Sequence, residues 1–403
     1  MNYRDALAWL YGTQNFGIKL GLDNTRRLLA AVGNPQARLR FLHVAGTNGK
    51  GSTCAMMDAI LRAAGHRTGL YTSPHLVDFR ERIRLDGAMI PESAVAEGLT
   101  LLRDAAETYD HAPTFFEFVT VLAAWWLARE NTEYVVWETG MGGRLDATSV
   151  VAPDVAVITP IGMDHQKWLG ETLAQIAGEK AGIIKSRVPV ISAPQAEEVR
   201  KVLTSTAAGL GSPITFVSEP WSGEAAGLVG PHQRWNAALA CAALRAAGVQ
   251  VDAEAESQGL RSVVWPGRFQ RVGEDLVIDG AHNPSAIETL VATWREVYGT
   301  ARASLVFGAV LDKDIEALLR ALRCIADEVW LVPVNNPRGA SPEKMRPMAE
   351  AAQFAAIHDG SVESSLAAAR ASGRPVLVAG SLFLAGEVLA LLEGVPRPQA
   401  TAQ

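Results

Sequence analysis

Residues 41–53 read FLHVAGTNGKGST, and this stretch decides the fold that we expect. An apolar run leads into a loop with three glycines and a lysine, and a helical pattern follows the loop. Glycines let backbone amides turn inward around a phosphate, and the following helix presents its positive N-terminal end to the anion. Lys50 would neutralise the outer phosphates, while Ser52 and Thr53 offer hydroxyl groups to phosphate or magnesium. The stretch therefore predicts a phosphate-binding loop.

The loop departs from the general expression for such loops, in which a hydroxyl residue directly follows the lysine. Here Gly51 stands between Lys50 and Ser52, and the glycines lie closer together than the expression requires. The alternative interpretation is a glycine-rich turn that only starts a helix. We favour the phosphate loop because strand, loop, lysine and helix follow one another in the required order.

Short β-branched runs alternate with longer helical patterns along the whole chain, which is typical of parallel sheets covered by helices. The first series predicts strands at residues 40–44, 68–71, 134–137, 155–159 and 188–192, and helices at 53–64, 116–128 and 235–247. The second series predicts strands at residues 276–278, 304–307, 329–332 and 376–378, and helices at 285–297 and 314–325. We therefore expect an α/β protein: an N-terminal P-loop ATPase domain with a mostly parallel sheet over residues 1–268, and a smaller C-terminal Rossmann-like α/β domain over residues 274–403.

The composition is that of a folded globular chain. Of 403 residues, 48% are apolar and 20% are charged, which excludes a disordered chain. The net charge is -6 and no dense basic block occurs, so we expect no nucleic-acid partner. The three cysteines are far apart and lack metal-ligand spacing, and no apolar stretch is long enough to span a bilayer. We expect a cytoplasmic protein without a membrane partner.

Polar residues follow the expected strands one after another. Ser73 follows the second expected strand, Glu138 the third and His165 the fourth. Lys180 comes further along, between small residues. Each has a plain alternative, which is a turn, a solvated strand end or a surface side chain. Because ligands of open α/β sheets bind beyond the carboxyl ends of the strands, the shared position favours a site, and a carboxylate beside glycines suits Mg²⁺.

Taken in order, these segments resemble the folylpolyglutamate synthase and dihydrofolate synthase family, a branch of the Mur-type ATP-dependent amide ligases. The resemblance extends from residues 17–22 (GIKLGL) to residues 380–381 (GS). Residues 46–52 match the family's own phosphate loop, which accounts for Gly51. Residues 72–76 (TSPHL) and 80–83 (RERI) resemble the signature that distinguishes folate ligases from cell-wall ligases.

The resemblance implies a role for each matching position. Lys50, His165, Lys180 and His282 would be the catalytic residues, with His282 near the terminal phosphate. The implied ATP-binding residues are Gly46, Thr47, Asn48, Gly49, Lys50, Gly51, Ser52, Asn236, Arg268 and Asp279. The implied Mg²⁺ ligands, for two ions, are Ser73, Glu138, His165 and Lys180 as a carbamylated lysine. The implied contacts to the pterin-bearing substrate are Thr114, Phe115, Phe116, Glu117, Leu145, Asp146 and Ala147. Core packing remains the alternative for Phe115 and Phe116, and a strand-end cap remains the alternative for Asp279 and His282.

The activity implied by the resemblance is the ATP-dependent addition of L-glutamate to dihydropteroate and to reduced folates, through an acyl phosphate, by a monomer. A first alternative is a cell-wall Mur ligase acting on a nucleotide-linked muramyl acid. It shares the phosphate loop, but residues 73–76 and 114–117 favour folate. A second alternative is a non-enzymatic nucleotide switch, which would not need a second α/β domain bearing Asp279 and His282.

Overall fold

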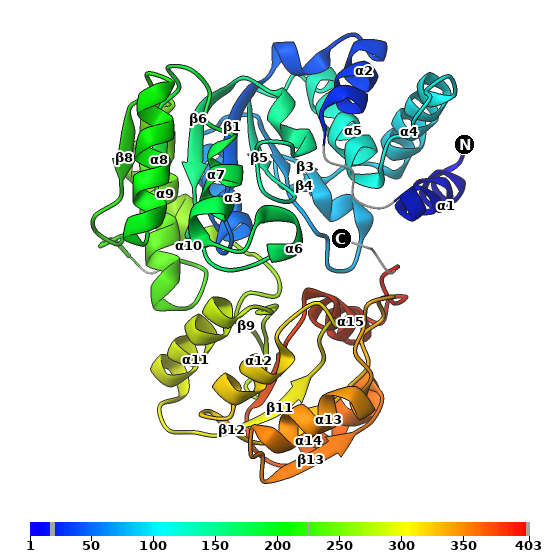
Figure 1. Cartoon of the computed structure of the whole chain (residues 1–403), viewed down its shortest axis with the longest axis vertical. Coiled ribbons are helices and arrows are strands. Elements are labelled where there is room, and N and C mark those ends of the chain that lie inside the picture. Colours follow the sequence, from blue (N-terminus) through cyan, green and yellow to red (C-terminus); the bar gives the residue numbers. More distant parts are fainter. Residues whose placement is uncertain (17–20, 225, 400–403) are drawn as a thin grey trace. The chain divides into compact units, whose positions relative to one another are not determined.

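The computed structural model describes residues 1–16, 21–224 and 226–399, so most of the predicted family segment at 17–22 lies outside the described residues. The chain divides into two compact units (Figure 1). The first, here the N-unit, comprises Met1–Pro74, Arg80–Gly227 and Arg234–Val263. The second, here the C-unit, comprises His75–Phe79, Leu228–Gln233 and Val264–Gln403.

Among the described residues, the N-unit contains an eight-stranded sheet in the order β4-β3-β2-β5-β1-β6-β7-β8. Its strands are β1 (Arg40–Ala45), β2 (Thr68–Tyr71), β3 (Ile83–Leu85), β4 (Ala88–Met89), β5 (Tyr134–Glu138), β6 (Pro153–Ile158), β7 (Val190–Ser192) and β8 (Ile214–Phe216). Only the pairs of β3 with β2 and β4 are antiparallel in this described sheet. Because β1 lies parallel between β5 and β6, the segments that follow these three strands emerge at one edge.

The N-unit helices pack around this sheet. They are α1 (Tyr3–Gly12), α2 (Asp23–Ala31), α3 (Lys50–Ala63), α4 (Glu92–Ala106), α5 (Phe115–Arg129), α6 (Gln166–Leu169), α7 (Leu173–Ala181), α8 (Glu197–Gly209), α9 (Pro231–Ala246, whose first three residues belong to the C-unit) and α10 (Ala253–Ser262). Short 3-10 helices occur at Thr13–Phe16, Pro35–Arg38, Phe79–Arg82 and Ala147–Val150. The strands β2 and β5 are buried along their whole length, as expected for parallel strands with helices on both faces.

The C-unit contains a six-stranded sheet among the described residues, in the order β13-β12-β11-β14-β10-β9. Its strands are β9 (Gln270–Val272), β10 (Leu276–Ile278), β11 (Ala303–Phe307), β12 (Ala326–Leu331), β13 (Ala356–Asp359) and β14 (Val376–Ala379). Its helices are α11 (Pro284–Tyr298), α12 (Ile315–Leu322), α13 (Pro342–Ala351), α14 (Val362–Ala371) and α15 (Leu382–Glu393). Only β9 is antiparallel to its neighbour within this part of the chain.

Two core clusters cover the two faces of the C-unit sheet, because successive side chains of a strand point to opposite faces. Val277 and Leu377 belong to one cluster, while Ile278 and Val378 belong to the other. The predicted two-domain, mostly parallel α/β fold is confirmed, and the strands predicted at 68–71 and 276–278 have those bounds. Strands β9 and β13 were not predicted from the sequence. Along the described residues, every helix is too short or too polar to span a membrane.

The segment His75–Phe79 belongs to the C-unit although it follows β2 directly in the chain. Leu76 packs in the same core cluster as Leu384 and Val388 of α15. A side chain at Gly386 would collide with the backbone of Leu76, so the glycine permits this close approach. The chain therefore leaves the N-unit immediately after Ser73 and Pro74 and enters the core of the other unit.

Candidate functional site

The predicted phosphate loop joins β1 to α3. Lys50 is the first residue of α3, earlier than the helix start expected at residue 53, and its Nζ donates to the carbonyls of Gly46 (3.2 Å) and Thr47 (3.3 Å). No side chain caps this helix, because its N-cap is Gly49 with a left-handed backbone (φ 84°). A Cβ on Gly46, where φ is 156°, would collide with Thr159 at the end of β6. Glycine is therefore required at Gly46, and the first turn of α3 has no capping side chain.

Thr47 and Asn48 of the phosphate loop are held by the segment that follows β6. The backbone N–H groups of Thr47 and Asn48 both donate to the carbonyl of Pro160, at 3.0 and 3.2 Å. Thr47 Oγ1 also donates to the carbonyl of Gly162 and accepts from its N–H, both at 3.1 Å. Ser52 is buried in the first turn of α3. The loop is thus fixed in one conformation by its neighbours, as a preorganised anion site requires.

Lys180 lies against the phosphate loop from α7. Its side chain is 4% exposed, and its Nζ donates to the carbonyl of Gly46 at 2.6 Å, so that both Lys50 and Lys180 contact the same carbonyl. Burial, with the positive charge of Lys50 as a second cause, lowers the pKa of Lys180 to about 7. Near pH 7 the Lys180 amine is therefore neutral in a large fraction of the molecules, which is unusual for a lysine.

Glu138 ends β5 and is 3% exposed. Its Oε2 accepts a hydrogen bond of 2.9 Å from the backbone N–H of Ser73, which follows β2. Both residues thus lie at the edge of the sheet where the phosphate loop leaves β1, because β5 pairs with both β1 and β2. The charges of Glu138 and Lys50 both act on the buried thiol of Cys54, whose pKa is raised mainly by burial.

His165 precedes α6 and is exposed, with a left-handed backbone (φ 50°). Its Nε2 lies 3.9 Å from Oδ2 of Asp164, and its backbone N–H donates to Oδ1 of the same residue at 2.8 Å. The Asp164 side chain is only 8% exposed, and its negative charge opposes the lowering of the pKa of Lys180. Sequence reasoning missed Asp164, although it directly precedes a predicted ligand at a strand end.

The predicted magnesium ligands stay a prediction. Among the described residues, no three His, Cys, Asp or Glu side chains form a group that could hold a metal. The predicted set contains only two residues of these types, Glu138 and His165. Its other two predicted ligands are the Ser73 hydroxyl and a carbamate on Lys180. The buried carboxylate of Glu138 beside Ser73 is a pair of hard oxygen donors, which is the ligand chemistry that Mg²⁺ prefers.

Asn236 lies in α9 and packs against the phosphate loop. It is 4% exposed, and a Cβ on Gly49 would lie 2.7 Å from its Oδ1. The structure therefore brings together three parts of the predicted N-unit site, namely the loop, Lys180 and Asn236. Lys180 and Asn236 each lie more than a hundred residues from the loop in the sequence, a distance that local patterns do not connect.

Two of the predicted substrate contacts have a local structural role. Thr114 is the N-cap of α5: its Oγ1 accepts from the N–H of Glu117 at 3.3 Å, and Glu117 Oε2 accepts from the N–H of Thr114 at 2.7 Å. Phe115 is buried, with its ring 5.5 Å from that of Tyr11. Phe116 is half-buried and is the member of the segment best placed to face a ligand. The substrate contacts themselves remain a prediction.

Residues 140–146, here the glycine loop, follow β5 and contain the predicted substrate contacts Leu145 and Asp146, and the last predicted contact, Ala147, comes directly after them. Asp146 Oδ2 accepts from the N–H of Met141 at 2.8 Å, and Asp146 Oδ1 accepts from the N–H and the hydroxyl of Thr148. Burial raises the pKa of Asp146, and these hydrogen bonds oppose the rise. Leu145 is half-buried beside it, and Ala147 is buried at the start of the next 3-10 helix. Asp146 Oδ2 therefore closes the glycine loop on Met141, while Oδ1 is held by Thr148.

The C-unit holds the remaining predicted residues after β10. Asp279 accepts from the N–H groups of Phe269 (2.7 Å) and Ala281 (2.8 Å), and burial raises its pKa while Arg268 opposes the rise. Arg268 Nη1 donates to the carbonyl of Gly267 at 3.0 Å. His282 Nδ1 lies 2.8 Å from the carbonyl of Gly280, so this nitrogen carries the proton. These three residues form one cluster within the C-unit.

His232 is a further member of this cluster that the sequence did not predict. Burial, with the charge of Arg268 as a second cause, lowers the pKa of His232 to about 4. The residue belongs to Leu228–Gln233, a short segment that joins the C-unit from between two N-unit segments. No local pattern in the sequence signals that contact.

Two family models match the chain. Residues 44–219 match the Mur ligase middle domain, and residues 267–382 match the glutamate ligase domain of Mur ligases. The dihydrofolate synthase/folylpolyglutamate synthase of Bacillus subtilis (strain 168) is 33% identical, over 96% of this chain and 98% of its own length. The chain belongs to the folylpolyglutamate synthase and dihydrofolate synthase family. The predicted membership is thus confirmed.

Solved structures of folylpolyglutamate synthase family members have the same fold. Escherichia coli FolC in complex with DHPP and ADP superposes with a TM-score of 0.87 at 34% identity, covering 96% of this chain and 98% of that chain. Mycobacterium tuberculosis folylpolyglutamate synthase complexed with ADP and AMPPCP gives a TM-score of 0.88 at 29% identity, covering 99% and 100%. The likeness therefore extends over both Mur ligase domains of the family.

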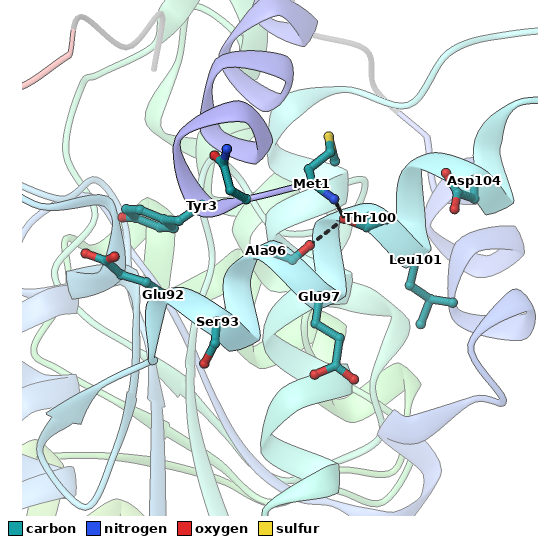
Figure 2. Close-up of a pocket in the computed structure, with 10 residues that line it drawn as sticks. Met1, Tyr3, Glu92, Ser93, Ala96, Glu97, Thr100, Leu101 and Asp104 are labelled. Atoms are coloured by element: carbon teal, nitrogen blue, oxygen red, sulfur yellow. Dashed lines mark hydrogen bonds between the residues drawn. The ribbon is translucent and has the colours of Figure 1, made fainter.

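A cavity of about 770 Å³ lies in the N-unit between the start of α1 and helix α4 (Figure 2). Figure 2 shows the terminal amine of Met1 beside Thr100, to whose Oγ1 it donates at 3.0 Å. The lining residues are Met1, Asn2, Tyr3, Glu92, Ser93, Ala96, Glu97, Thr100, Leu101 and Asp104. None of them is a predicted site residue of the family, so this cavity is not the site assembled around the phosphate loop.

Proposed function

We propose that this chain is an ATP-dependent ligase that adds L-glutamate to dihydropteroate and to reduced folates. The observation that carries the proposal is the pairing of Lys50 and Lys180 on the carbonyl of Gly46, at the start of a helix without a capping side chain. The ammonium of Lys50 and a helix N-terminus at one point favour a multiply charged anion such as a triphosphate. Membership of the family supplies the substrate class.

The chemical problem is that a carboxylate is a poor electrophile, because its leaving group would be oxide. Transfer of the γ-phosphoryl group of ATP to the carboxylate oxygen gives an acyl phosphate and ADP. The amine of glutamate then attacks the acyl carbon, the C–O bond to phosphate breaks, and an amide, inorganic phosphate and a proton result. Positioning and charge stabilisation account for most of the catalysis of phosphoryl transfer.

Lys50 and the first turn of α3 are the groups of this chain that would stabilise the phosphates. The ammonium of Lys50 donates to the loop carbonyls of Gly46 and Thr47. The N–H groups of a helix's first turn have no partner within the helix. We propose that Asn236 contacts the nucleotide, and that Arg268, Asp279 and His282 of the C-unit contribute to ATP binding. Of these, Arg268 supplies a permanent positive charge.

Glu138, Ser73, His165 and a carbamylated Lys180 are the residues that we propose to hold two Mg²⁺ ions. When bound, magnesium neutralises the charge that develops on the phosphate oxygens. The buried contact between Glu138 Oε2 and the Ser73 N–H keeps this carboxylate oriented at the end of β5. His165 is exposed in the segment between β6 and α6, with its Nε2 3.9 Å from Oδ2 of Asp164.

Carbamylation of Lys180 has a physical basis in this structure. The neutral amine attacks CO₂, an N–C bond forms, and one proton leaves, so an ammonium becomes an anionic oxygen ligand. The lowered pKa, about 7, keeps the amine available for this step. The carbamate nitrogen retains one hydrogen, so the bond to the carbonyl of Gly46 survives. The change also removes a positive charge that faces Lys50.

A phosphate-release assay tests the proposal, with ATP, glutamate and either dihydropteroate or tetrahydrofolate, and each component omitted in turn. We expect release to require all three substrates, with either pterin-bearing acid accepted. Release that needs a nucleotide-linked muramyl acid would identify a cell-wall ligase instead. Release that ignores every added acid would support a nucleotide switch. We further propose a cytoplasmic monomer without nucleic-acid or membrane partners, which sedimentation of the purified protein tests for oligomeric state.

A further inference from the structure

His43 lies in the middle of β1 and is fully buried, in a strand whose other residues at 41–45 are apolar. Its Nε2 lies 3.0 Å from Thr148 Oγ1, and no hydrogen-bond partner of its Nδ1 occurs among the described residues. Burial lowers the pKa of His43 to about 3, so the ring is neutral near pH 7. A buried ring with one unpartnered nitrogen costs free energy that an apolar side chain would not. Packing alone therefore does not explain this histidine.

The position of each proton in this network follows from the carboxylate of Asp146. Asp146 Oδ1 accepts from the hydroxyl of Thr148 at 2.5 Å and from its N–H at 3.0 Å. The Thr148 hydroxyl uses its only hydrogen in this bond to Asp146, so it can only accept a hydrogen bond from His43. His43 therefore carries its proton on Nε2, and its unpartnered Nδ1 is a lone pair instead of a stranded N–H group.

The glycine loop, which Asp146 closes, lies against two other parts of the site. A Cβ on Gly143 would lie 2.8 Å from the carbonyl oxygens of both Glu179 and Lys180. A Cβ on Gly140 would lie 2.5 Å from Cζ of Phe116. A loop that loosens would therefore release the start of α5, where the acceptor substrate is expected, and the end of α7, which carries Lys180.

We propose that His43 is a positioning residue of the ligase site. Its Nε2–H fixes the Thr148 hydroxyl in the orientation that donates to Asp146, and Asp146 then holds the glycine loop closed against Phe116 and α7. The kinetic part of this inference rests on the proposed function, whereas the closure of the loop can be measured without it. The acceptor acid is the substrate most affected, since the phosphate loop is held by other bonds.

The test uses two substitutions of His43 and one matched control. His43→Phe keeps a ring of similar size without the donor, and His43→Gln places an amide N–H near the position of Nε2. Phe41→Leu is the control, because Phe41 is a buried residue two positions along the same strand, on the same face, and the substitution removes no side-chain hydrogen bond. Hydrogen exchange of the peptide covering residues 140–148 reports loop closure, and steady-state kinetics report the Michaelis constants for dihydropteroate and ATP.

We expect His43→Phe to speed exchange in the glycine loop about tenfold and to raise the Michaelis constant for dihydropteroate about tenfold, as for the loss of one buried hydrogen bond. The constant for ATP should change less than about twofold, since Lys50 is held by carbonyls outside this network. His43→Gln should restore most of both losses. Phe41→Leu should lower the melting temperature without either change.

Wild-type exchange and kinetics in His43→Phe would overturn the proposal, and so would a His43→Gln variant no better than His43→Phe. If His43→Phe does not fold, Thr148→Val against Thr148→Ser gives the same comparison from the middle of the network. In the double variant His43→Phe/Thr148→Val, the rise in loop exchange and in the Michaelis constant for dihydropteroate should not exceed the rise in either single variant. A loop that opens in His43→Phe, in a protein with no ligase activity in any form, would support the positioning role and reject the proposed function.

Discussion

Both units contain a strand that runs into a short polar loop and then a helix, but the two loops are completed differently. In the N-unit, α3 begins at Lys50 with a glycine N-cap and no capping side chain. In the C-unit, Asn283 caps α11 by accepting from the N–H of Ala286 at 2.9 Å, and Asp279 accepts two further backbone N–H groups. Helix N-termini need partners for their first N–H groups. The C-unit provides a capping side chain, whereas the N-unit loop provides none, which agrees with the proposed anion site.

The two loops also differ in the charge of their side chains: the N-unit loop is surrounded by lysines, and the C-unit loop contains a carboxylate. Lys50 and Lys180 share the carbonyl of Gly46, and the charge of Lys50 contributes to the low pKa of Lys180. Asp279 in the C-unit is a buried carboxylate already bonded to its own loop. A bound phosphate, or conversion of the Lys180 amine to a carbamate, would remove the repulsion that arises when both side chains are protonated. These differences support the proposed binding of phosphate at the N-unit loop.

The largest effect should come from Lys50→Ala. Removing this ammonium leaves the transferred phosphoryl group without its nearest cation, so we expect kcat/KM to fall by about 10³-fold or more. The melting temperature should change little, because Lys50 contacts only partly buried carbonyls of its own loop. Phosphate release measures activity, and Lys201→Ala, an exposed lysine paired with Glu197, is the control. Near-normal turnover in Lys50→Ala would remove the distinction between the two loops.

The second effect concerns Lys180. We expect Lys180→Ala to lose activity by about 10²-fold or more, and added formate or acetate to restore part of it by supplying the missing oxygen ligands. Labelling with ¹³C-bicarbonate should give a carbamate signal in the wild-type protein that is absent from the variant. Lys185→Ala is the control, since its ammonium donates to the Gly182 carbonyl at 3.4 Å, away from the phosphate loop. A labelled carbamate that persists in Lys180→Ala would assign the modification elsewhere.

A smaller effect should follow in the C-unit from Asn283→Ala. Loss of the N-cap bond should lower the free energy of unfolding by about 1 kcal/mol, with the Michaelis constant for ATP changed by less than about threefold. Urea unfolding followed by circular dichroism measures the loss. Asp252→Ala, which removes the cap of α10 in the N-unit, should cost a similar amount. A large rise in the constant for ATP, without loss of stability, would mean that α11 also presents its N-terminus to the nucleotide.

The contrast between these loops also shows what sequence reasoning can reach. The strands and the residues that follow them were predictable, because apolar runs mark strands and the carboxyl ends of parallel strands share an edge. The residues that contact them in the folded chain could not be predicted from the sequence. Asp164 and His232 act through contacts that only the folded chain creates, and His75–Phe79 joins a unit distant in sequence. The capping role of Thr114 and Glu117, in contrast, was readable from their spacing.

The last prediction concerns the strand that precedes each loop, and its effect appears only as a dependence on pH. β10 is apolar throughout, whereas β1 contains His43, whose pKa is about 3 in the folded protein and near 6.5 in the unfolded chain. Between these values the unfolded state binds more protons, so stability rises with pH from 3 to 6.5 and falls on acidification through that window. His43→Phe should therefore reduce the proton uptake on unfolding by about one, or about 1.4 kcal/mol per pH unit near pH 5. Urea unfolding at pH 4.5, 5 and 5.5 (all about the middle of that window) measures the slope, with His111→Phe, an exposed residue, as the control. Equal slopes in His43→Phe and wild type would mean that the imidazole is not held neutral, and the two units would then differ in their loops alone.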